Sequence, residues 1–149
     1  MRLIDANIFI FFANVGALED LLKLSGLAIT SSVLRRELAP GSPARLGVEQ
    51  ALADKQIALV DMDLQPEGTL FEVFYRGQGF GEGESTCMAI CLNRGLGFYT
   101  YDLDALHKAR SLGVDARAWQ DLVDELLEAH HVSSRRAQRL RRQIQALMG

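Results

Sequence analysis

RLIDANIFI, residues 2–10, combines a very short apolar strand with the start of an apolar helix, and Asp5 stands between the two. The carboxyl end of a strand in an open α/β sheet lies at the crevice where such folds bind their ligands. Asp5 is therefore the first candidate for chemistry. A second interpretation is that Asp5 caps the helix, with Asn7 as a turn residue, because Asp is a preferred N-cap.

The length of the chain sets the number of domains. With 149 residues, it can bury one full hydrophobic core and is too short for two ordinary domains, so we expect a single domain over residues 1–149. The 48% hydrophobic and 23% charged residues are typical of a soluble globular protein. The apolar run 8–15 is too short to span a membrane and lacks a small-residue cleavage site, so we expect no membrane segment and a cytoplasmic location.

Apolar segments of strand length alternate with segments of helical periodicity along the chain. We expect strands near residues 27–29, 57–60 and 97–102, with a further edge strand near Val114, and helices over residues 17–24, 32–38, 42–56, 65–75, 81–95, 103–112, 118–129 and 133–149. Strands that alternate with helices at this spacing indicate a three-layer α/β/α sandwich around a mostly parallel sheet.

Four acidic side chains fall at comparable places in this pattern. Asp5 and Asp102 each end a strand. Glu37 lies on a short helix that follows a strand, and Glu84 lies at the start of a helix that follows a glycine-rich loop. The carboxyl ends of parallel strands share one edge, so these acids can converge there. Four such carboxylates repel one another unless divalent cations neutralise them, and oxygen ligands select Mg²⁺ or Mn²⁺.

Two such cations can activate a water molecule and stabilise the leaving oxygen of a phosphodiester, so hydrolysis of nucleic acid is the reaction that fits best. Competing arrangements are weak. The three histidines lie late in the chain, and the glycine-rich loop 77–81 follows a helix and lacks the Lys-Ser/Thr ending of phosphate-binding loops. Cys87 and Cys91 have no nearby ligand partners and fit buried free thiols.

At this point the sequence resembles the PIN-domain nucleases. The resemblance is carried by LIDAN at residues 3–7, SVLRREL at 32–38, GEGES at 81–85 with Ala89, and YTYD at 99–102 followed by Ala109 and Leu112-Gly113. These motifs cover most of residues 1–115 in the family's order. The resemblance implies a parallel α/β/α fold whose acids bind Mg²⁺ or Mn²⁺ for RNA cleavage.

The resemblance also implies roles for individual residues. The matching catalytic acids are Asp5, Glu37, Glu84 and Asp102, the supporting polar residues are Asn7 and Thr100, and Asp104 is a further metal ligand in the position of an extra acid of some relatives. Many relatives have Asp or Asn where this chain has Tyr101, which leaves the last ligand open between Asp102 and Asp104. Glu82 is the corresponding alternative to Glu84, although the family pattern favours Glu84.

Charge is distributed unevenly. Residues 133–149 carry five arginines and no acid, so the net charge of −3 leaves −8 on the rest of the chain. Arg135, Arg139 and Arg142 lie three or four residues apart, on one face of the expected basic C-terminal helix, where they could contact RNA phosphates. The alternative is a solvated face, or one that pairs with the acidic body of a second subunit.

The small size resembles the VapC-type toxins of toxin–antitoxin pairs, which implies a homodimer and an antitoxin partner, whereas the last two helices resemble a related prokaryotic PIN group. One rival from another class is a catalytically inactive PIN-like module whose acids are helix caps and whose surface serves protein contacts. A second rival is a phospho-acceptor receiver domain. The chain lacks the adjacent acids near its first strand and the late strand ending in Lys that a receiver needs.

Overall fold

A central sheet of five parallel strands, in the order β3-β2-β1-β4-β5, organises the computed structural model, which describes residues 1–149. The strands are β1 (Arg2–Ile4), β2 (Leu27–Thr30), β3 (Ile57–Val60), β4 (Gly97–Thr100) and β5 (Ala116–Ala118). β1 is the central strand and pairs with both β2 and β4. Asp5, which follows β1 directly, therefore lies at the middle of the carboxyl edge of the sheet.

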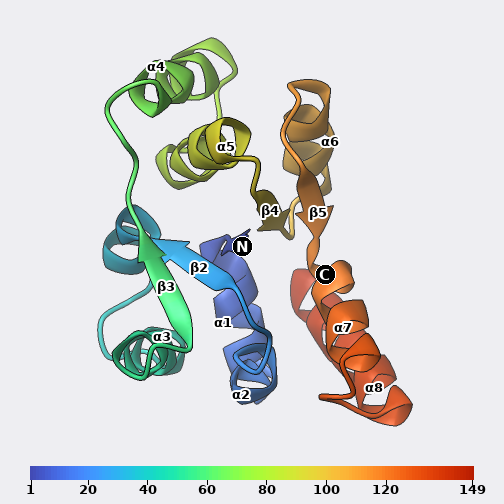
Figure 1. Ribbon diagram of the computed structural model, residues 1–149. Helices are drawn as coiled ribbons and strands as arrows, with labels where there is room; N and C mark the ends of the chain where they lie inside the picture. Colours follow the sequence, from blue (N-terminus) through green and yellow to red (C-terminus); the bar gives the residue numbers. More distant parts are fainter.

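Helices cover both faces of the sheet (Figure 1). One layer contains α1 (Ala6–Asn14), α2 (Leu18–Leu21), α3 (Pro43–Ala53), α7 (Trp119–Glu128) and α8 (Ser134–Met148), and the other contains α4 (Glu67–Glu72), α5 (Glu82–Arg94) and α6 (Leu103–Ser111). The expected three-layer α/β/α sandwich is confirmed, and all of its strand pairs are parallel.

Polar side chains start several helices where the sequence predicts them. The Ser42 Oγ accepts a hydrogen bond from the Arg45 amide at 3.2 Å, with Pro43 in the first helical position of α3. The Ser133 Oγ accepts one from the Arg136 amide at 3.1 Å at the start of α8. These caps satisfy amide groups that have no partner inside a helix, so they fix where the helices begin.

Two helical segments have a wider winding than the sequence indicates. They are the π-helical turns η1 (Val33–Glu37) and η2 (Val73–Gly77). In η1 the Leu38 amide donates to the Val33 carbonyl, five residues earlier, at 3.3 Å. The edge strand β5 also begins two residues later than Val114, because Val114 closes the turn after α6 by donating to the Ala109 carbonyl at 3.0 Å.

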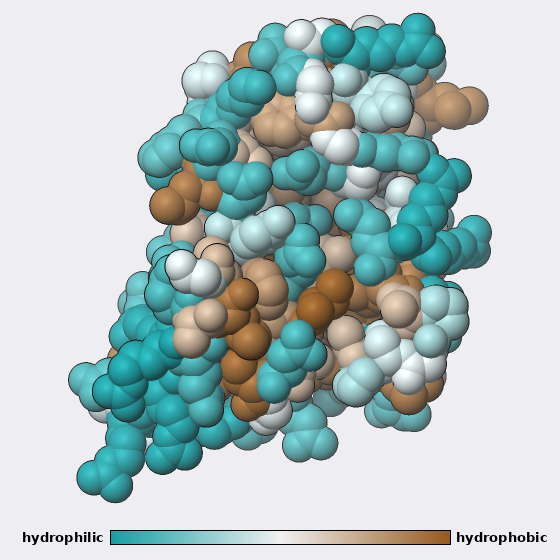
Figure 2. Space-filling model, turned by 180° about the vertical axis from the view of Figure 1, so that it is seen from behind, coloured by the Kyte–Doolittle hydropathy of each residue, from teal (hydrophilic) through white to brown (hydrophobic).

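The last helix is packed against the layer that contains α1 and α7. Ala137, Leu140 and Ile144 on α8 are fully buried in the hydrophobic core, while the opposite side of the helix carries its arginines. Figure 2, which shows the molecule from behind, displays the resulting hydrophilic surface over α8 at its lower left. None of the helices has both the length and the apolar character that crossing a membrane requires.

Candidate active site

Asp5 is fixed by its backbone and buried at the carboxyl edge of the sheet. Its amide donates to the Tyr99 carbonyl at 3.1 Å, which ties it to β4, and its Oδ1 accepts from the Ala6 amide at 2.9 Å as the N-cap of α1. The residue is 4% exposed. Burial, followed by the negative charges of Glu84 and Glu37, raises the pKa of Asp5 to about 7. Capping and membership of an acidic cluster therefore coexist in one side chain.

Glu84 and Glu37 approach Asp5 from two different helices. Glu84 lies in the first turn of α5, where burial and the charge of Asp102 raise its pKa. Glu37 is the last residue of η1, and burial and the charge of Glu82 raise its pKa. The first turn of α5 lies against Glu37, because a Cβ built on Gly83 would come within 2.8 Å of the Glu37 Cδ. Only a glycine leaves room for the Glu37 carboxylate here.

The structure distinguishes Glu84 from its neighbour Glu82. Glu82 forms an exposed ion pair with Arg36, and its charge acts on Glu37 and not on Asp5. Glu84 is half-buried and lines a groove together with Asp102. Of the two glutamates, Glu84 is the one whose charge acts on Asp5.

Asp102 begins α6 and faces the same cluster. Its Oδ1 accepts from the amides of Asp104 and Ala105, at 2.9 and 3.3 Å. The Thr100 hydroxyl accepts from the Asp102 amide at 3.2 Å, so Thr100, which is 1% exposed, orients the turn that carries Asp102. Asp102 raises the pKa of both Asp5 and Glu84, whereas Asp104 is exposed on the outer side of the turn. Asp102 is therefore the nearer of the two to the other acids.

Tyr101 occupies the position between Thr100 and Asp102. Its ring packs edge-on against Phe11, with 5.4 Å between the centroids. Burial and the charge of Asp102 raise the pKa of Tyr101, while a hydrogen bond with the Asn7 side chain lowers it. Asn7 therefore acts on the phenol next to the acidic cluster and holds no acid of the cluster itself.

The donor set is suited to a hard divalent cation, because it consists of carboxylate oxygens that repel one another. The carboxylates that act on one another electrostatically are Asp5, Glu37, Glu84 and Asp102. As the side chains stand, no three His, Cys, Asp or Glu residues converge tightly enough to coordinate one ion. Glutamate side chains rotate about their χ angles, so Glu37 and Glu84 could move closer to the aspartates around an ion.

Two residues near the acids were not singled out from the sequence as site residues. Thr30, at the end of β2, is 1% exposed, and its hydroxyl accepts from the Val33 amide at 3.1 Å, which orients η1 toward the cluster. Lys108, on α6, lines the same groove as Glu84 and Asp102. The position of Thr30 at a strand end is a usable sequence signal. A lysine in the middle of a helix gives none.

The arginines of α8 separate into two groups. Arg136 pairs with Asp20 at 2.5 Å, and Arg141 pairs with Asp124. The three arginines predicted to contact RNA are all exposed and form no ion pair within the chain: Arg135, Arg139 and Arg142.

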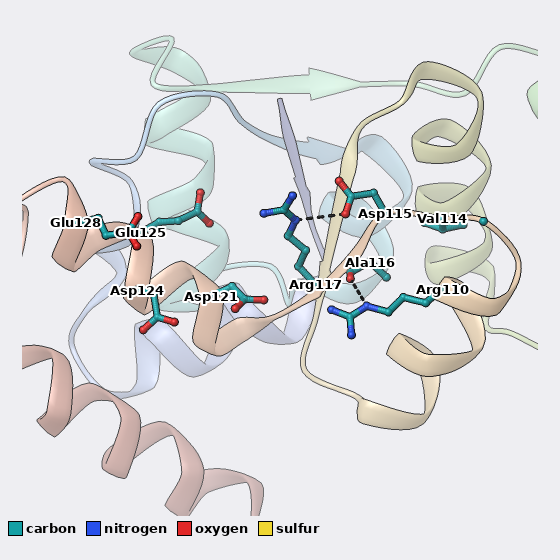
Figure 3. A pocket seen from close by; sticks show the side chains of 10 residues that line it. Arg110, Val114, Asp115, Ala116, Arg117, Asp121, Asp124, Glu125 and Glu128 are labelled. Atoms are coloured by element: carbon teal, nitrogen blue, oxygen red, sulfur yellow. Dashed lines mark hydrogen bonds and ion pairs between the residues drawn. The ribbon is translucent and has the colours of Figure 1, made fainter.

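A second hollow, of about 790 Å³, lies between β5, α6 and α7 (Figure 3). Its acids are largely engaged in structural contacts. Asp115 pairs with Arg117 at 3.3 Å, and Glu125 accepts from the Tyr99 hydroxyl at 2.9 Å. The Arg110 side chain donates to the Ala116 carbonyl at 2.8 Å. This hollow is lined by the amino end of β5, at the opposite edge of the sheet from Asp5.

Comparison with known proteins shows which class of fold has the acidic residues' sheet as its centre. No protein-family model matches the sequence, and no curated protein matches it significantly. Among solved structures, a PilT N-terminus domain protein of the hyperthermophilic archaeon Sulfolobus solfataricus P2 is similar, with 17% identity, coverage of 89% of this chain and 98% of that chain, and a TM-score of 0.51.

Two further solved structures are similar. A protein of Pyrobaculum aerophilum has 19% identity, coverage of 84% of this chain and 93% of that chain, and a TM-score of 0.54. VapBC2 of Rickettsia felis, solved with a DNA fragment from its promoter, has 14% identity, coverage of 79% and 98%, and a TM-score of 0.51. The chain therefore has the fold of the PilT N-terminus (PIN) domains, as the sequence motifs predict.

Proposed function

We propose that this protein is a divalent-cation-dependent endoribonuclease. The observation that carries the proposal is the carboxyl edge of the sheet, where Asp5, Glu84 and Asp102 arrive from three different elements. There the charges of Glu84 and Asp102 add to burial in raising the pKa of Asp5, and the charge of Asp102 adds to burial in raising the pKa of Glu84. A buried acid with a pKa of about 7 is unfavourable for folding as an anion, and a bound cation relieves that cost. Acids used only as helix caps need not converge in this way.

Each acid has a distinct part in this proposal. Asp5, Glu84 and Asp102 would hold Mg²⁺ or Mn²⁺ through their carboxylate oxygens, with Asp104 as a further ligand and Glu37 as the remaining acid of the set. When bound there, the cation would lower the pKa of the attacking water and stabilise the leaving oxygen of the phosphodiester. Thr100 keeps Asp102 in place through the Asp102 amide. The chain contributes no nucleophile of its own.

We infer in addition that the protein acts as the toxin of a toxin–antitoxin pair and forms a homodimer. The fold likeness to VapBC2 and the small size of the chain support this inference. An antitoxin segment would then cover the acidic groove. Expression of the wild-type protein in a bacterial host is expected to arrest growth, whereas Asp5→Asn is expected to leave growth unchanged. Equal growth with the two chains would remove the toxin role and leave the nuclease proposal standing.

The alternative is a PIN-like interaction module without catalysis. It is favoured by one observation, namely that Asp5 and Asp102 both cap helices. The two functions differ in their response to cations, because an interaction module gains no stability from Mn²⁺.

A matched pair of substitutions on α5 tests the nuclease. Glu84→Gln removes a charge that acts on Asp5. Glu82→Gln removes an equal charge two residues earlier in the helix, from a side chain that forms an exposed ion pair with Arg36. With a labelled single-stranded RNA and Mn²⁺, we expect Glu84→Gln to reduce cleavage at least about a hundredfold, the usual effect of losing one group that stabilises transition-state charge. Glu82→Gln should change cleavage less than about threefold. Equal effects of the two substitutions would contradict the assignment.

A further inference from the structure

We propose that Lys108 forms a phosphate subsite for the RNA backbone, next to the acidic cluster on the α6 side. This inference rests on the proposed function, because it names the group that receives the negatively charged substrate at that site. The observation that carries it is a groove of about 700 Å³ whose lining includes three acids and one lysine: Glu84, Asp102, Asp104 and Lys108.

Lys108 is held in place without a carboxylate partner. Its Nζ donates to the Gln78 carbonyl at 3.2 Å and lies 5.3 Å from the centroid of the Phe80 ring. Phe80 is buried, so the ring is a fixed platform. An ammonium group has three donors and the carbonyl takes one of them, so the others remain free for a ligand.

The position of Lys108 on α6 matches a ligand that enters past the acids. Asp104 and Lys108 are four residues apart, one helical turn, so they lie on the same face of α6 about 6 Å apart along its axis. The ammonium could reach toward Asp104, yet it donates to Gln78 instead. The Lys108 ammonium therefore keeps free N–H donors beside three acids, and these donors can bind a phosphate that other contacts bring into the groove.

Charge explains why such a subsite is needed. A phosphate approaching Glu84, Asp102 and Asp104 meets like charges, and bound cations neutralise only the atoms that they touch. Lysine binds phosphate as a compact positive charge and is a common phosphate ligand. Lys108 therefore offsets the repulsion for the phosphate adjacent to the cleaved bond.

The glycine-rich loop at residues 77–81 holds the two residues that contact Lys108. Gly79 has a φ of +74°, which turns the chain between Gln78 and Phe80, the two residues that contact Lys108. The loop is therefore no phosphate cradle of its own. It orients the lysine that binds the phosphate.

The experiment measures RNA affinity against salt concentration, in the Asp5→Asn background with Mg²⁺, for Lys108→Met, Lys108→Arg and Lys23→Met. Lys23 is an exposed lysine on the segment after α2, so its substitution changes the net charge equally. We expect Lys108→Met to weaken binding about three- to tenfold and to reduce the salt slope by about 0.7, the value for one phosphate contact on a single strand. Lys108→Arg should retain the slope, and Lys23→Met should not change it.

Each outcome separates the inference from the proposed function. An unchanged salt slope in Lys108→Met, or an equal change in Lys23→Met, overturns the subsite, even where the wild-type protein cleaves RNA. A lower affinity with an unchanged slope would mean that Lys108 only holds the loop, and this also overturns it. If Lys108→Met reduces the salt slope but the wild-type protein does not cleave RNA, the phosphate subsite is supported and the nuclease proposal is refuted. No RNA binding by the parent protein would refute both.

Discussion

Asp5 is unusual because the folded chain raises the pKa of this carboxyl from 3.8 to about 7. Between these two values the native state binds more protons than the unfolded chain, so the stability of the metal-free protein falls as pH rises from about 4 to 7. Asp5→Asn removes the charge and retains an oxygen for the Ala6 amide. We expect its free energy of unfolding at pH 8, without metal, to exceed that of the wild type by up to about 4 kcal/mol.

Urea unfolding of both proteins at pH 5 and pH 8, with a chelator present, measures this effect. The gap between them should shrink at pH 5, where most of the wild-type Asp5 is protonated. An Asp5→Asn protein that unfolds at lower urea than the wild type at pH 8 would show that the carboxylate is structural.

Gly83 separates activity from stability at a single residue. Gly83→Ala places a Cβ against the Glu37 carboxylate, which can swing away because it is the end of a flexible side chain. We expect the free energy of unfolding to change by about 1 kcal/mol or less, since alanine also favours the helix. RNA cleavage should fall about tenfold or more, because the displaced Glu37 leaves the acidic set. Normal cleavage would mean that Glu37 takes no part in the reaction.

At the scale of elements, Glu67 connects the start of α4 to the end of α5. Its fully buried carboxylate accepts from the Arg94 side chain at 2.8 and 2.9 Å, from Asn93 at 2.9 Å and from the Asp63 amide at 2.7 Å. The Arg94 hydrogen bonds are the main cause that lowers the pKa of Glu67 from 4.5 to about 2. This contribution to stability is complete above pH 4.5 and is lost as pH falls toward 2.

Glu67→Gln is therefore expected to reduce the free energy of unfolding at pH 7 by about 3 kcal/mol, the low end for removal of one partner of a buried ion pair. Glu72→Gln is the control, because Glu72 pairs with Arg76 on the surface and should change stability by less than about 1 kcal/mol. Thermal unfolding at pH 7 and pH 3 measures both. Equal losses at the two pH values would contradict the role of the Glu67 charge.

The elements also show how far the sequence predicts the fold. Ser42 and Ser133 act on the backbone amides of their own segments, and they cap helices that begin where the sequence pattern predicts. The π-helical turns at Val33–Glu37 and Val73–Gly77 come shortly after a strand and directly after a helix, and apolar periodicity does not distinguish such turns from α-helical ones. The pKa of Asp5 and the groove beside Lys108 depend on contacts between distant segments, so the sequence predicts which acids gather but not their burial.

For the whole molecule, the orientation of α8 determines which arginines lie near the acidic edge. Its first turn contacts α2 through the Arg136–Asp20 pair, beyond the far end of α1, whereas Arg142 lies beside Trp119, which follows the carboxyl end of β5. Arg142 is therefore nearer the acidic edge than Arg135, by about 10 Å along the helix.

We expect Arg142→Gln to reduce the salt slope of RNA binding by about 0.7 and Arg135→Gln to change it by much less. Fluorescence anisotropy over a range of salt concentrations measures both. Substitution is preferable to truncation after His131, because truncation would expose the core that Ala137, Leu140 and Ile144 cover. Equal effects of the two arginines would mean that α8 does not present a graded RNA surface.

A manganese-soaked crystal tests the central claim most directly, because anomalous scattering locates the ion independently of activity. We predict Mn²⁺ density in contact with Asp5, Glu84 and Asp102. Asp104 would join through a water molecule. A fully occupied crystal with Mn²⁺ elsewhere, or with none at the carboxyl edge of the sheet, would contradict the assignment of this edge as a metal centre.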